Sequence, residues 1–348
     1  MPETTVPGGT SYRDAGVDRA RAQHAKGRIL ELVESSLTPG VVRNPGGFGG
    51  LLRVPRDFSD GLLVSSADGV GTKLKVAMRA GRHDTVGHDL VNHCVNDILV
   101  EGAHPLFFLD YIGMGRLESH VVEALVTGMV AGCRENDCAL LGGETAEMPD
   151  FYAPGEYDLA GFIVGLTREQ QRPGAHRVGR GDVLLGLAAN GFHTNGYTLL
   201  RRVLFDRMKL DVHDAYPGTG RPVADELLRV HRSYLHAVLP LVRDGSAHAL
   251  AHITGGGIAE NLERVIPAGL RARVDTSTWP IPRACIAIME AGPVARPEMF
   301  ATFNMGIGMI VVVGADQAST ISGRLEQAGQ EVVPMGEVEA GEPRVVLA

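Results

Sequence analysis

Four acidic residues of the first half of the chain lie in four different predicted elements and can converge on one site: Asp68, Asp97, Asp110 and Glu144. Asp68 and Asp110 each end a predicted strand, and Glu144 follows a Gly-Gly pair. Carboxylates that gather without matching cations repel one another unless hard cations neutralise them, and Mg²⁺ with a polyphosphate is the usual solution. The alternative is a set of unrelated turn and N-cap acids. We favour convergence, which predicts a magnesium–nucleotide site.

One stretch of helical period carries an unusual polar stripe. In residues 85–103, short polar side chains recur at helical spacing opposite the apolar face: Asp89, Asn92, His93, Asn96 and Asp97. Such a stripe is usually a solvated surface. Here it has no Lys, Arg or Glu, the residues that dominate exposed helix surfaces. We therefore predict that the stripe faces a ligand or a metal.

Three glycine-rich segments are suited to phosphate. DGVGTK (68–73) offers backbone N–H groups and a lysine charge, although a tight turn with a surface lysine is an equal interpretation. GFHTNGY (191–197) and HITGGG (252–257) each precede a predicted helix, whose N-terminus attracts anions. GGFGG (46–50) is a mobile lid or a hairpin turn.

Alternating strands and helices must position these residues. In the first half we expect helices at 85–103 and 118–136, with strands at 62–68, 105–115, 138–143 and 157–167. The polar segment 167–182 marks a domain boundary, which divides the chain into domains 1–170 and 171–348. In the second half we expect helices at 196–207, 222–242, 257–265 and 315–328, with strands at 182–189, 248–254, 306–314, 331–337 and 344–347. The result is an α/β or α+β protein.

Composition narrows the function classes. The 348 residues carry 33 basic and 41 acidic side chains, and the net charge of −8 argues against a nucleic-acid partner. Four scattered cysteines predict free thiols rather than disulfides or a structural zinc. Neither a signal peptide nor a membrane-spanning stretch is expected, so we predict a soluble cytoplasmic protein.

Taken in order, the motifs resemble those of the phosphoribosylformylglycinamidine cyclo-ligase (aminoimidazole ribonucleotide synthetase) family. The resemblance covers almost the whole chain and rests on SYRDAGVD (11–18), GGFGG (46–50), DGVGTK (68–73), HDLVNHCVNDI (88–98), GAHPLFFLDY (102–111), GGETAEMP (142–149), GFHTNGY (191–197), HITGGG (252–257) and TFNMGIGM (302–309).

The resemblance implies an N-terminal α/β domain that binds ATP and Mg²⁺ and a C-terminal α+β domain that binds the substrate. It also implies a homodimer in which the N-terminal sheets pair into a barrel-like interface. The reaction would be the fifth step of de novo purine biosynthesis. In that step formylglycinamidine ribonucleotide and ATP give aminoimidazole ribonucleotide, ADP and phosphate through an iminophosphate.

The resemblance also assigns roles to residues of this sequence. The metal ligands would be Asp68, Asp97 and Glu144, and the nucleotide would also contact Gly69, Gly71, Thr72 and Lys73. Thr194, Asn195, Gly255 and Gly256 would hold the ribose phosphate of the substrate. His193 is the first candidate for polarising the formyl oxygen or moving a proton, and His252 is the second.

Related families fit the sequence less well. The formylglycinamide ribonucleotide amidotransferase carries this unit twice, and no internal repeat is present here. Selenophosphate synthetase needs a reactive N-terminal cysteine, and the hydrogenase maturation protein ends in one, whereas the first cysteine here is Cys94 and the chain ends VVLA. Thiamine-monophosphate kinase is not expected to carry GGETAEMP and GFHTNGY. A nucleotide-binding scaffold without turnover is the alternative from a different class.

Overall fold

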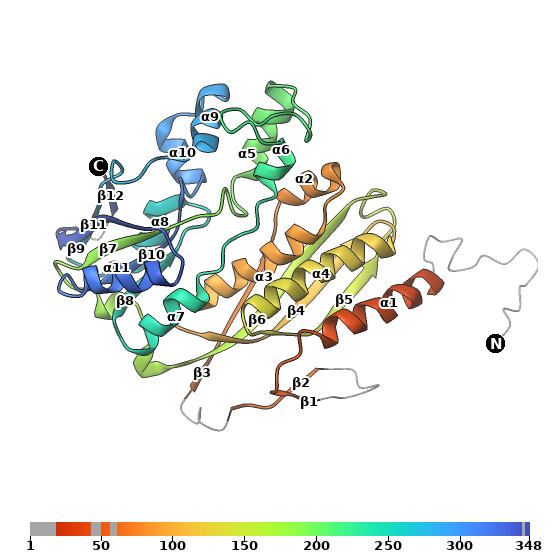
Figure 1. Cartoon of the computed structure of the whole chain (residues 1–348), viewed down its shortest axis with the longest axis horizontal. Helices are drawn as coiled ribbons and strands as arrows, with labels where there is room; N and C mark the ends of the chain where they lie inside the picture. The colour runs from red at the N-terminus through yellow and green to blue at the C-terminus, as the bar shows by residue number, and fades with distance from the viewer. Residues whose placement is uncertain (1–18, 43–49, 56–60, 343–344) are drawn as a thin grey trace, which may run out of the picture.

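The computed structural model describes residues 19–42, 50–55, 61–342 and 345–348 (Figure 1). The SYRDAGVD motif (11–18) and all but Gly50 of GGFGG lie outside the described residues, so the choice between a lid and a hairpin stays open. Among the described residues, no helix is both long and apolar enough to cross a membrane.

The first half of the chain builds a four-stranded sheet. Its spatial order is β3 (Gly61–Gly69), β6 (Tyr157–Arg168), β4 (His104–Met114) and β5 (Ala139–Glu147), and only β4 and β5 run parallel. The helices α3 (Asp84–Leu99) and α4 (Ser119–Glu135) cover one face, and α1 (Arg19–Glu34) packs on α4 (Figure 1). These two helices and four strands confirm the expected elements. A short ribbon of β1 (Val41–Val42) and β2 (Leu51–Leu52) precedes the sheet, and α2 (Lys73–Ala80) follows β3 directly.

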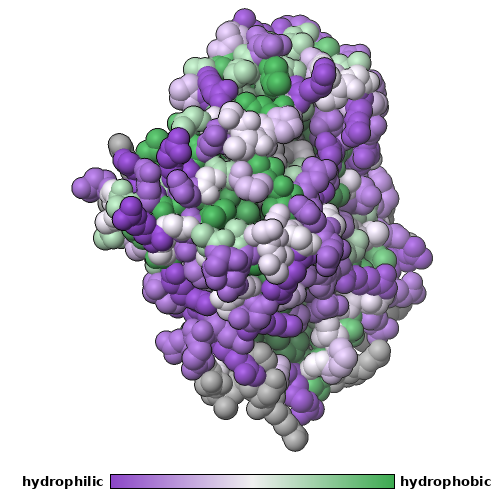
Figure 2. Space-filling view, turned by 60° about the vertical axis from the view of Figure 1, so that its left-hand side comes forward, coloured by the Kyte–Doolittle hydropathy of each residue, from purple (hydrophilic) through white to green (hydrophobic). Residues whose placement is uncertain are grey.

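The second half builds a six-stranded sheet. Its order is β12 (Val345–Leu347), β9 (Leu270–Val274), β11 (Val332–Ala340), β7 (Val183–Ala188), β10 (Ile307–Val313) and β8 (Ala247–His252). All neighbours are antiparallel except β12 and β9. Strand β10, which lies between β7 and β8, is buried along its whole length, as its unbroken apolar run requires. In the view that brings the second half forward, exposed hydrophobic side chains gather near the middle of the surface and polar side chains surround them (Figure 2).

The described residues of the second half form seven α-helices, of which the two at 283–291 and 296–302 were not expected from the sequence. The seven helices are α5 (Tyr197–Arg201) with a π-helical continuation (Arg202–Arg207), α6 (Val223–Leu227), α7 (Leu235–Arg243), α8 (Gly257–Glu263), α9 (Arg283–Ala291), α10 (Arg296–Thr302) and α11 (Ala318–Gln327). The expected single helix over 222–242 is wrong, because residues 228–234 between α6 and α7 are not helical.

The interruption at 228–234 has a clear physical cause in the polar stripe of α3. Asn92 and Asn96 donate side-chain hydrogen bonds to the carbonyl groups of His231 and Arg232, each at 2.8 Å. The N–H of His231 donates to Asp89 Oδ1 at 2.7 Å, and the N–H of Tyr234 donates to Asn96 Oδ1 at 3.1 Å. Side chains of α3 thus replace the hydrogen bonds that a continuous helix would have made.

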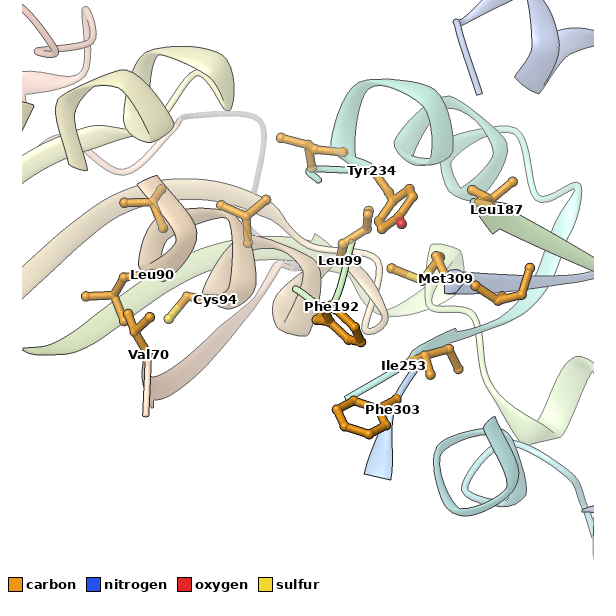
Figure 3. Packing of buried hydrophobic residues seen from close by; sticks show 14 of the residues in the cluster. Val70, Leu90, Cys94, Leu99, Leu187, Phe192, Tyr234, Ile253, Phe303 and Met309 are labelled. Atoms are coloured by element: carbon orange, nitrogen blue, oxygen red, sulfur yellow. The ribbon is translucent and has the colours of Figure 1, made fainter. Parts of the chain in front are cut away.

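The two sheets share one hydrophobic core. Buried side chains run from Leu90, Cys94 and Leu99 on α3 past Phe192 and Tyr234 to Met309 on β10, without a break between the halves (Figure 3). All four cysteines are buried free thiols, as expected. The polar stripe of α3 therefore crosses a region that is otherwise apolar.

A buried ion pair fixes the two halves to each other. Lys73 Nζ lies 2.7 Å from Asp89 Oδ2, and both side chains are fully buried. The same amino group donates to the carbonyl of His193 at 3.0 Å and to that of Arg229 at 2.8 Å. A charge from the first half thus holds two backbone segments of the second half, which is a geometry that desolvation makes costly to break.

We expect Lys73→Met to lower the free energy of unfolding by about 3–5 kcal/mol, because Asp89 would remain buried without its partner. Urea denaturation of the purified chain measures this change. Lys75→Met is the matched control, since Lys75 and its partner Glu156 have side chains 40% and 41% exposed. That variant should lose no more than about 1 kcal/mol. Equal losses in the two variants would contradict the structural role of the buried pair.

Candidate active site

Two carboxylates of the first half meet at one imidazole. Asp68 lies at the end of β3 and Asp97 in the last turn of α3, where the stripe predicted it. His93, one helical turn before Asp97, places Nε2 3.0 Å from Asp68 Oδ2 and 3.7 Å from Asp97 Oδ2. The His93 side chain is 5% exposed, whereas Asp68 and Asp97 are 41% and 23% exposed. The carboxylate oxygens therefore remain within reach of a ligand.

Three imidazoles from both halves, His93, His231 and His252, continue this arrangement as a hydrogen-bonded chain. His252 Nδ1 lies 2.9 Å from Asp97 Oδ1, and His252 Nε2 lies 3.0 Å from His231 Nε2. The Thr194 hydroxyl lies 2.8 Å from His93 Nδ1 and 3.4 Å from His231 Nδ1. Since a carboxylate only accepts, we assign the proton of His252 to Nδ1 and a donated proton to His231 Nε2. His93 then donates from both ring nitrogens, to Thr194 and to Asp68.

The electrostatics agree with one cationic imidazole in this cluster. Burial alone would lower the pKa of His93, but the hydrogen bond to Asp68 and the charge of Asp97 outweigh it and raise that pKa. Burial alone would raise the pKa of Asp68 and of Asp97, but His93 and His252 respectively lower it below its ordinary value. Burial lowers the pKa of His252 and, further, that of His231. These shifts favour ionised carboxylates at Asp68 and Asp97, a protonated His93, and neutral His231 and His252.

Two cavities open on either side of these residues. The larger cavity, of about 670 Å³, lies between β3, the end of α3, β8 and α8, and its lining includes Asp97, His252 and Arg264. The smaller cavity, of about 430 Å³, is lined by Asp68, Gly69, Gly71, His93, Thr194, Asn195, Thr254 and Gly255. Asp68, His93 and Thr254 belong to both linings. Ligands in the two cavities would therefore meet at the carboxylates.

The glycine-rich segments supply most of the smaller cavity. Gly69, Gly71, Thr194, Asn195 and Gly255, all predicted binding residues, line it. Thr72 lines an adjoining surface pocket of about 590 Å³, where its hydroxyl lies 3.0 Å from that of Thr198. Gly256 stands behind the lining at φ +90°, where a side chain would collide with Glu260. It shapes the loop rather than facing the cavity.

His193 does not occupy the place predicted for it. Its side chain is fully buried, and it belongs to the lining of neither cavity. Nε2 accepts a hydrogen bond from the N–H of Asn190 at 3.1 Å, Nδ1 has no partner, and the ring stacks on His231 with centroids 3.9 Å apart. With a left-handed φ of +58°, this residue turns the loop so that Thr194 and Asn195 reach the cavity. In this arrangement His193 does not face either cavity, and its predicted role in polarising the formyl oxygen or moving a proton stays a prediction.

Lys73 also departs from its predicted role. All three N–H groups of its amino group are used by Asp89 and by the carbonyls of His193 and Arg229, so no donor remains for a phosphate.

The polar stripe on α3 likewise separates into residues that pack against the second half and residues that face the cavities. Asp89, Asn92 and Asn96 hold the second half of the chain, and only His93 and Asp97 face the cavities.

The strand register separates Glu144 from the other predicted metal ligands. Asp68 pairs with Gly161 on β6, Gly161 with Asp110 on β4, and Asp110 with Gly143 on β5, so these four share one face of the sheet. Glu144 is the next residue and points to the opposite face. Three strand spacings, roughly 14 Å, also lie between β3 and β5. Within one chain, the prediction that Glu144 joins Asp68 and Asp97 is contradicted.

Asp110 lies on the helix-covered face but two strands from Asp68, so it does not join the pair either. Burial, reinforced by the charge of Glu144, raises the pKa of Asp110 to about 7. Its neighbour in the register is Gly143, where any side chain would collide with the Asp110 carboxyl. Gly143 therefore leaves room for the Asp110 carboxyl on the helix-covered face of the sheet.

Two imidazoles of the site were not selected from the sequence. His93 was recognised only as a member of the α3 stripe, although its position four residues before Asp97 was a usable signal. His231 carried no signal, because it lies in a segment that was expected to be an ordinary helix.

Comparison with known proteins places this two-domain architecture among the AIR synthase related proteins. The family model described as "AIR synthase related protein, N-terminal domain" matches residues 50–167, and that described as "AIR synthase related protein, C-terminal domain" matches residues 179–348. The chain is also similar in fold to a thiamine-monophosphate kinase from Stenotrophomonas maltophilia K279a, with a TM-score of 0.69 at 20% identity over 95% of this chain and 96% of that one. A hydrogenase maturation protein HypE in complex with ATP gives a TM-score of 0.67 at 18% identity over 92% and 90% of the two chains.

Curated sequences narrow the class to one family. A phosphoribosylformylglycinamidine cyclo-ligase from Trichlorobacter lovleyi is 45% identical over 95% of both chains. Further relatives of the same name, such as one from Geobacter sulfurreducens at 46% over 96% of this chain and 97% of its own length, agree. The chain belongs to the phosphoribosylformylglycinamidine cyclo-ligase family, as its motifs indicated. The expected combination of an α/β half and an α+β half is confirmed.

The raised pKa of Asp110 predicts a pH dependence of stability. Because the folded state binds this proton more tightly than the unfolded chain, stability is highest below the unfolded pKa and falls as pH rises toward about 7. Asp110→Asn should remove that fall and stabilise the chain by up to about 4 kcal/mol at about pH 8, with little effect at about pH 4. Urea unfolding at both pH values measures it. Asp206→Asn, at an exposed carboxylate, should leave the pH profile as it is. If Asp110→Asn also leaves the pH profile of stability unchanged, the assignment of this pH dependence to Asp110 is contradicted.

Proposed function

We propose that this chain catalyses the ATP-dependent ring closure of formylglycinamidine ribonucleotide to aminoimidazole ribonucleotide, ADP and phosphate, the fifth step of de novo purine biosynthesis. Membership of the cyclo-ligase family supports the reaction. The observation that carries the proposal is the junction of two cavities, whose shared lining of Asp68, His93 and Thr254 lies beside Asp97. A transfer between two bound molecules needs such a junction.

The reaction needs ATP because the formyl oxygen is a poor leaving group until it is phosphorylated. The formyl oxygen of the substrate attacks the terminal phosphorus of ATP and ADP departs, which leaves an iminophosphate. The amidine nitrogen of the same molecule then attacks the activated carbon, phosphate departs, and one proton is released as the imidazole ring closes. Since the second attack is intramolecular, holding the two ends together contributes several kcal/mol. The chain's own residues mainly position groups and neutralise charge.

The residues present fit a divalent cation. Asp68 and Asp97 present partly exposed carboxylate oxygens on one side of His93, and oxygen is the donor that Mg²⁺ prefers. We propose that these two residues, without Glu144, hold the Mg²⁺ that neutralises ATP phosphates. When bound, that ion lowers the charge repulsion between the phosphates and the attacking oxygen. His252 Nδ1 donates a hydrogen bond to Asp97, and His252 also lines the larger cavity. Both observations support its role as a proton carrier.

The loops around the smaller cavity are suited to a phosphate monoester. Thr194, Asn195 and Gly255 line it, and Asn261 holds the glycine loop in place by donating to the carbonyls of Gly255 and Gly257 at 3.1 and 2.8 Å. Gly69 and Gly71 complete the lining from the first half and serve the nucleotide. We propose that the ribose phosphate of the substrate lies against Thr194, Asn195 and Gly255, with Gly256 keeping the loop in shape.

Domain organisation and assembly follow the same proposal. Residues 1–170 would bind ATP and Mg²⁺, and residues 171–348 the ribonucleotide. The uncovered face of the first sheet exposes Leu63 and Phe162, by 69% and 48%, which supports pairing with a second copy through that face. We place the homodimer in the cytoplasm, where four buried free thiols persist.

The test of function is phosphate release that requires formylglycinamidine ribonucleotide, ATP and Mg²⁺ together. Asp97→Asn should lower kcat by at least about two orders of magnitude, because the site loses a charged cation ligand but no core volume. Glu263→Gln, on the exposed side of α8, is the control and should retain the wild-type rate. Tight ATP binding without turnover in the wild type would favour a scaffold, and a near-normal rate in Asp97→Asn would misplace the metal.

A paired glycine experiment tests the phosphate loop. At Gly255 an added Cβ has only Asn195 Oδ1 within 4 Å, at 3.7 Å, so Gly255→Ala should fold normally. Its methyl would enter the smaller cavity, and we expect the KM for the ribonucleotide to rise about tenfold or more. At Gly257, an added Cβ would lie 1.7 Å from the Phe300 carbonyl with φ at +63°, so Gly257→Ala should destabilise the fold. Steady-state kinetics and thermal unfolding separate the two effects, and an unchanged KM in Gly255→Ala would remove this loop from substrate binding.

A further inference from the structure

Two imidazole nitrogens lie directly beside the proposed cation ligands Asp68 and Asp97. A magnesium site built from oxygen ligands alone does not need them. His93, Asp97 and His252 each offer one donor atom, and these atoms lie within 4.8 Å of one another. Asp68 Oδ2 is a further donor, 3.0 Å from His93 Nε2. We propose that His93, Asp97 and His252, with Asp68 beside them, form a binding site for a first-row transition-metal dication. This inference deepens the proposed metal site by naming two nitrogen ligands and a different class of ion.

The spacing of the donors suits such an ion. In a tetrahedral site with bonds of about 2.0–2.1 Å, neighbouring donor atoms lie about 3.4 Å apart. His93 Nε2 is 3.0 Å from the Asp68 oxygen and 3.7 Å from an Asp97 oxygen, and His252 Nδ1 is 2.9 Å from the other Asp97 oxygen. These separations bracket the tetrahedral value of about 3.4 Å. The donor atoms that His93, Asp97 and His252 offer all lie within 4.8 Å of one another.

The far side of each imidazole is already held. Metal-bound histidines almost always fix their second ring nitrogen through an outer hydrogen bond. His93 Nδ1 bonds the Thr194 hydroxyl at 2.8 Å, and His252 Nε2 bonds His231 Nε2 at 3.0 Å. An ion at His252 Nδ1 requires the proton of His252 to move to Nε2, which then donates to His231, and that of His231 to move to Nδ1. Both rings are therefore oriented toward the carboxylates before any ion arrives.

The second histidine group of the cluster is not a metal site in this arrangement. His193, His231 and His252 also bring donor atoms within 4.8 Å. However, the rings of His193 and His231 stack at 3.9 Å with an interplanar angle of 24°. A metal lies near the plane of each ring that binds it, and two stacked rings cannot share one. This geometry leaves the His93 group as the candidate.

The donor set also selects the ion. Imidazole favours zinc, iron, nickel and copper, and cobalt is close to them in the same series, whereas Mg²⁺ requires oxygen ligands and keeps its water. Two imidazoles with two carboxylates therefore favour a transition metal in the absence of nucleotide. Mg²⁺ would engage only the carboxylates, and needs the phosphates of ATP to complete its shell.

The test is a Co²⁺ titration of the metal-stripped full chain without nucleotide, followed by ligand-field absorption and calorimetry. We expect one Co²⁺ per chain and no displacement by a large excess of Mg²⁺. His93→Met should weaken binding by more than about tenfold. Thr194→Val keeps every ligand but removes the outer hydrogen bond, and should weaken binding by about tenfold. Circular dichroism verifies that each variant is folded.

His248→Ala is the matched control, since His248 Nδ1 lies 2.8 Å from Asp182 in a separate His–Asp pair. It should bind Co²⁺ as the wild type does. The proposal is overturned if the wild type gives no ligand-field spectrum, if Mg²⁺ displaces Co²⁺ at similar concentrations, or if both His93→Met and Thr194→Val bind as tightly as the wild type. Phosphate release with Mg²⁺ and both substrates is measured separately, so the proposed reaction can succeed where this metal site fails, and the reverse.

Discussion

The buried contact between Lys73 and Asp89 is the constraint on which the site depends. Two charges removed from water are tolerable only when each is fully partnered, and here the partners come from both halves of the chain. The lysine holds the carbonyl of His193 while the aspartate holds the N–H of His231. The loop with Thr194 and the segment with His231 are therefore placed against α3 by the same pair. The site lies where the halves are tied together rather than in a hinge.

The alternation of side chains along a strand imposes the second constraint. Asp68 and Asp110 share a register row and a face, so a helix can cover both, whereas Glu144 is one residue beyond that row and faces away. A sequence shows that an acid follows a glycine pair at a strand end. It does not show the parity of that acid relative to strands that pair with it far along the chain. Asp68 and Asp97 therefore converge as predicted, whereas Asp110 and Glu144 do not join them.

Local patterns predicted most of the fold because each element of the first sheet carries its own period. The glycine loops were also visible, since Gly69, Gly71 and Gly255 occur in short motifs before helices. The errors share one cause, which is that long-range partners replaced local preferences. The α3 asparagines broke the expected helix at 228–234, and Asp89 drew Lys73 into the interior. The same stripe served two purposes, and its spacing alone did not separate packing residues from ligands.

The contacts of His93 determine how the cluster responds to a bound cation. Asp68 and Asp97 flank His93, and among the described residues the protonated imidazole of His93 is the one cation within 4 Å of both carboxylates. A dication that enters between Asp68 and Asp97 approaches the same nitrogen, and repulsion must expel the proton or push the ring aside. If the proton leaves, the nitrogen becomes a ligand. If the ring moves, its bond to Thr194 breaks and the wall shared by both cavities opens. Cation binding is thus coupled to the lining of both cavities, whichever ion is present.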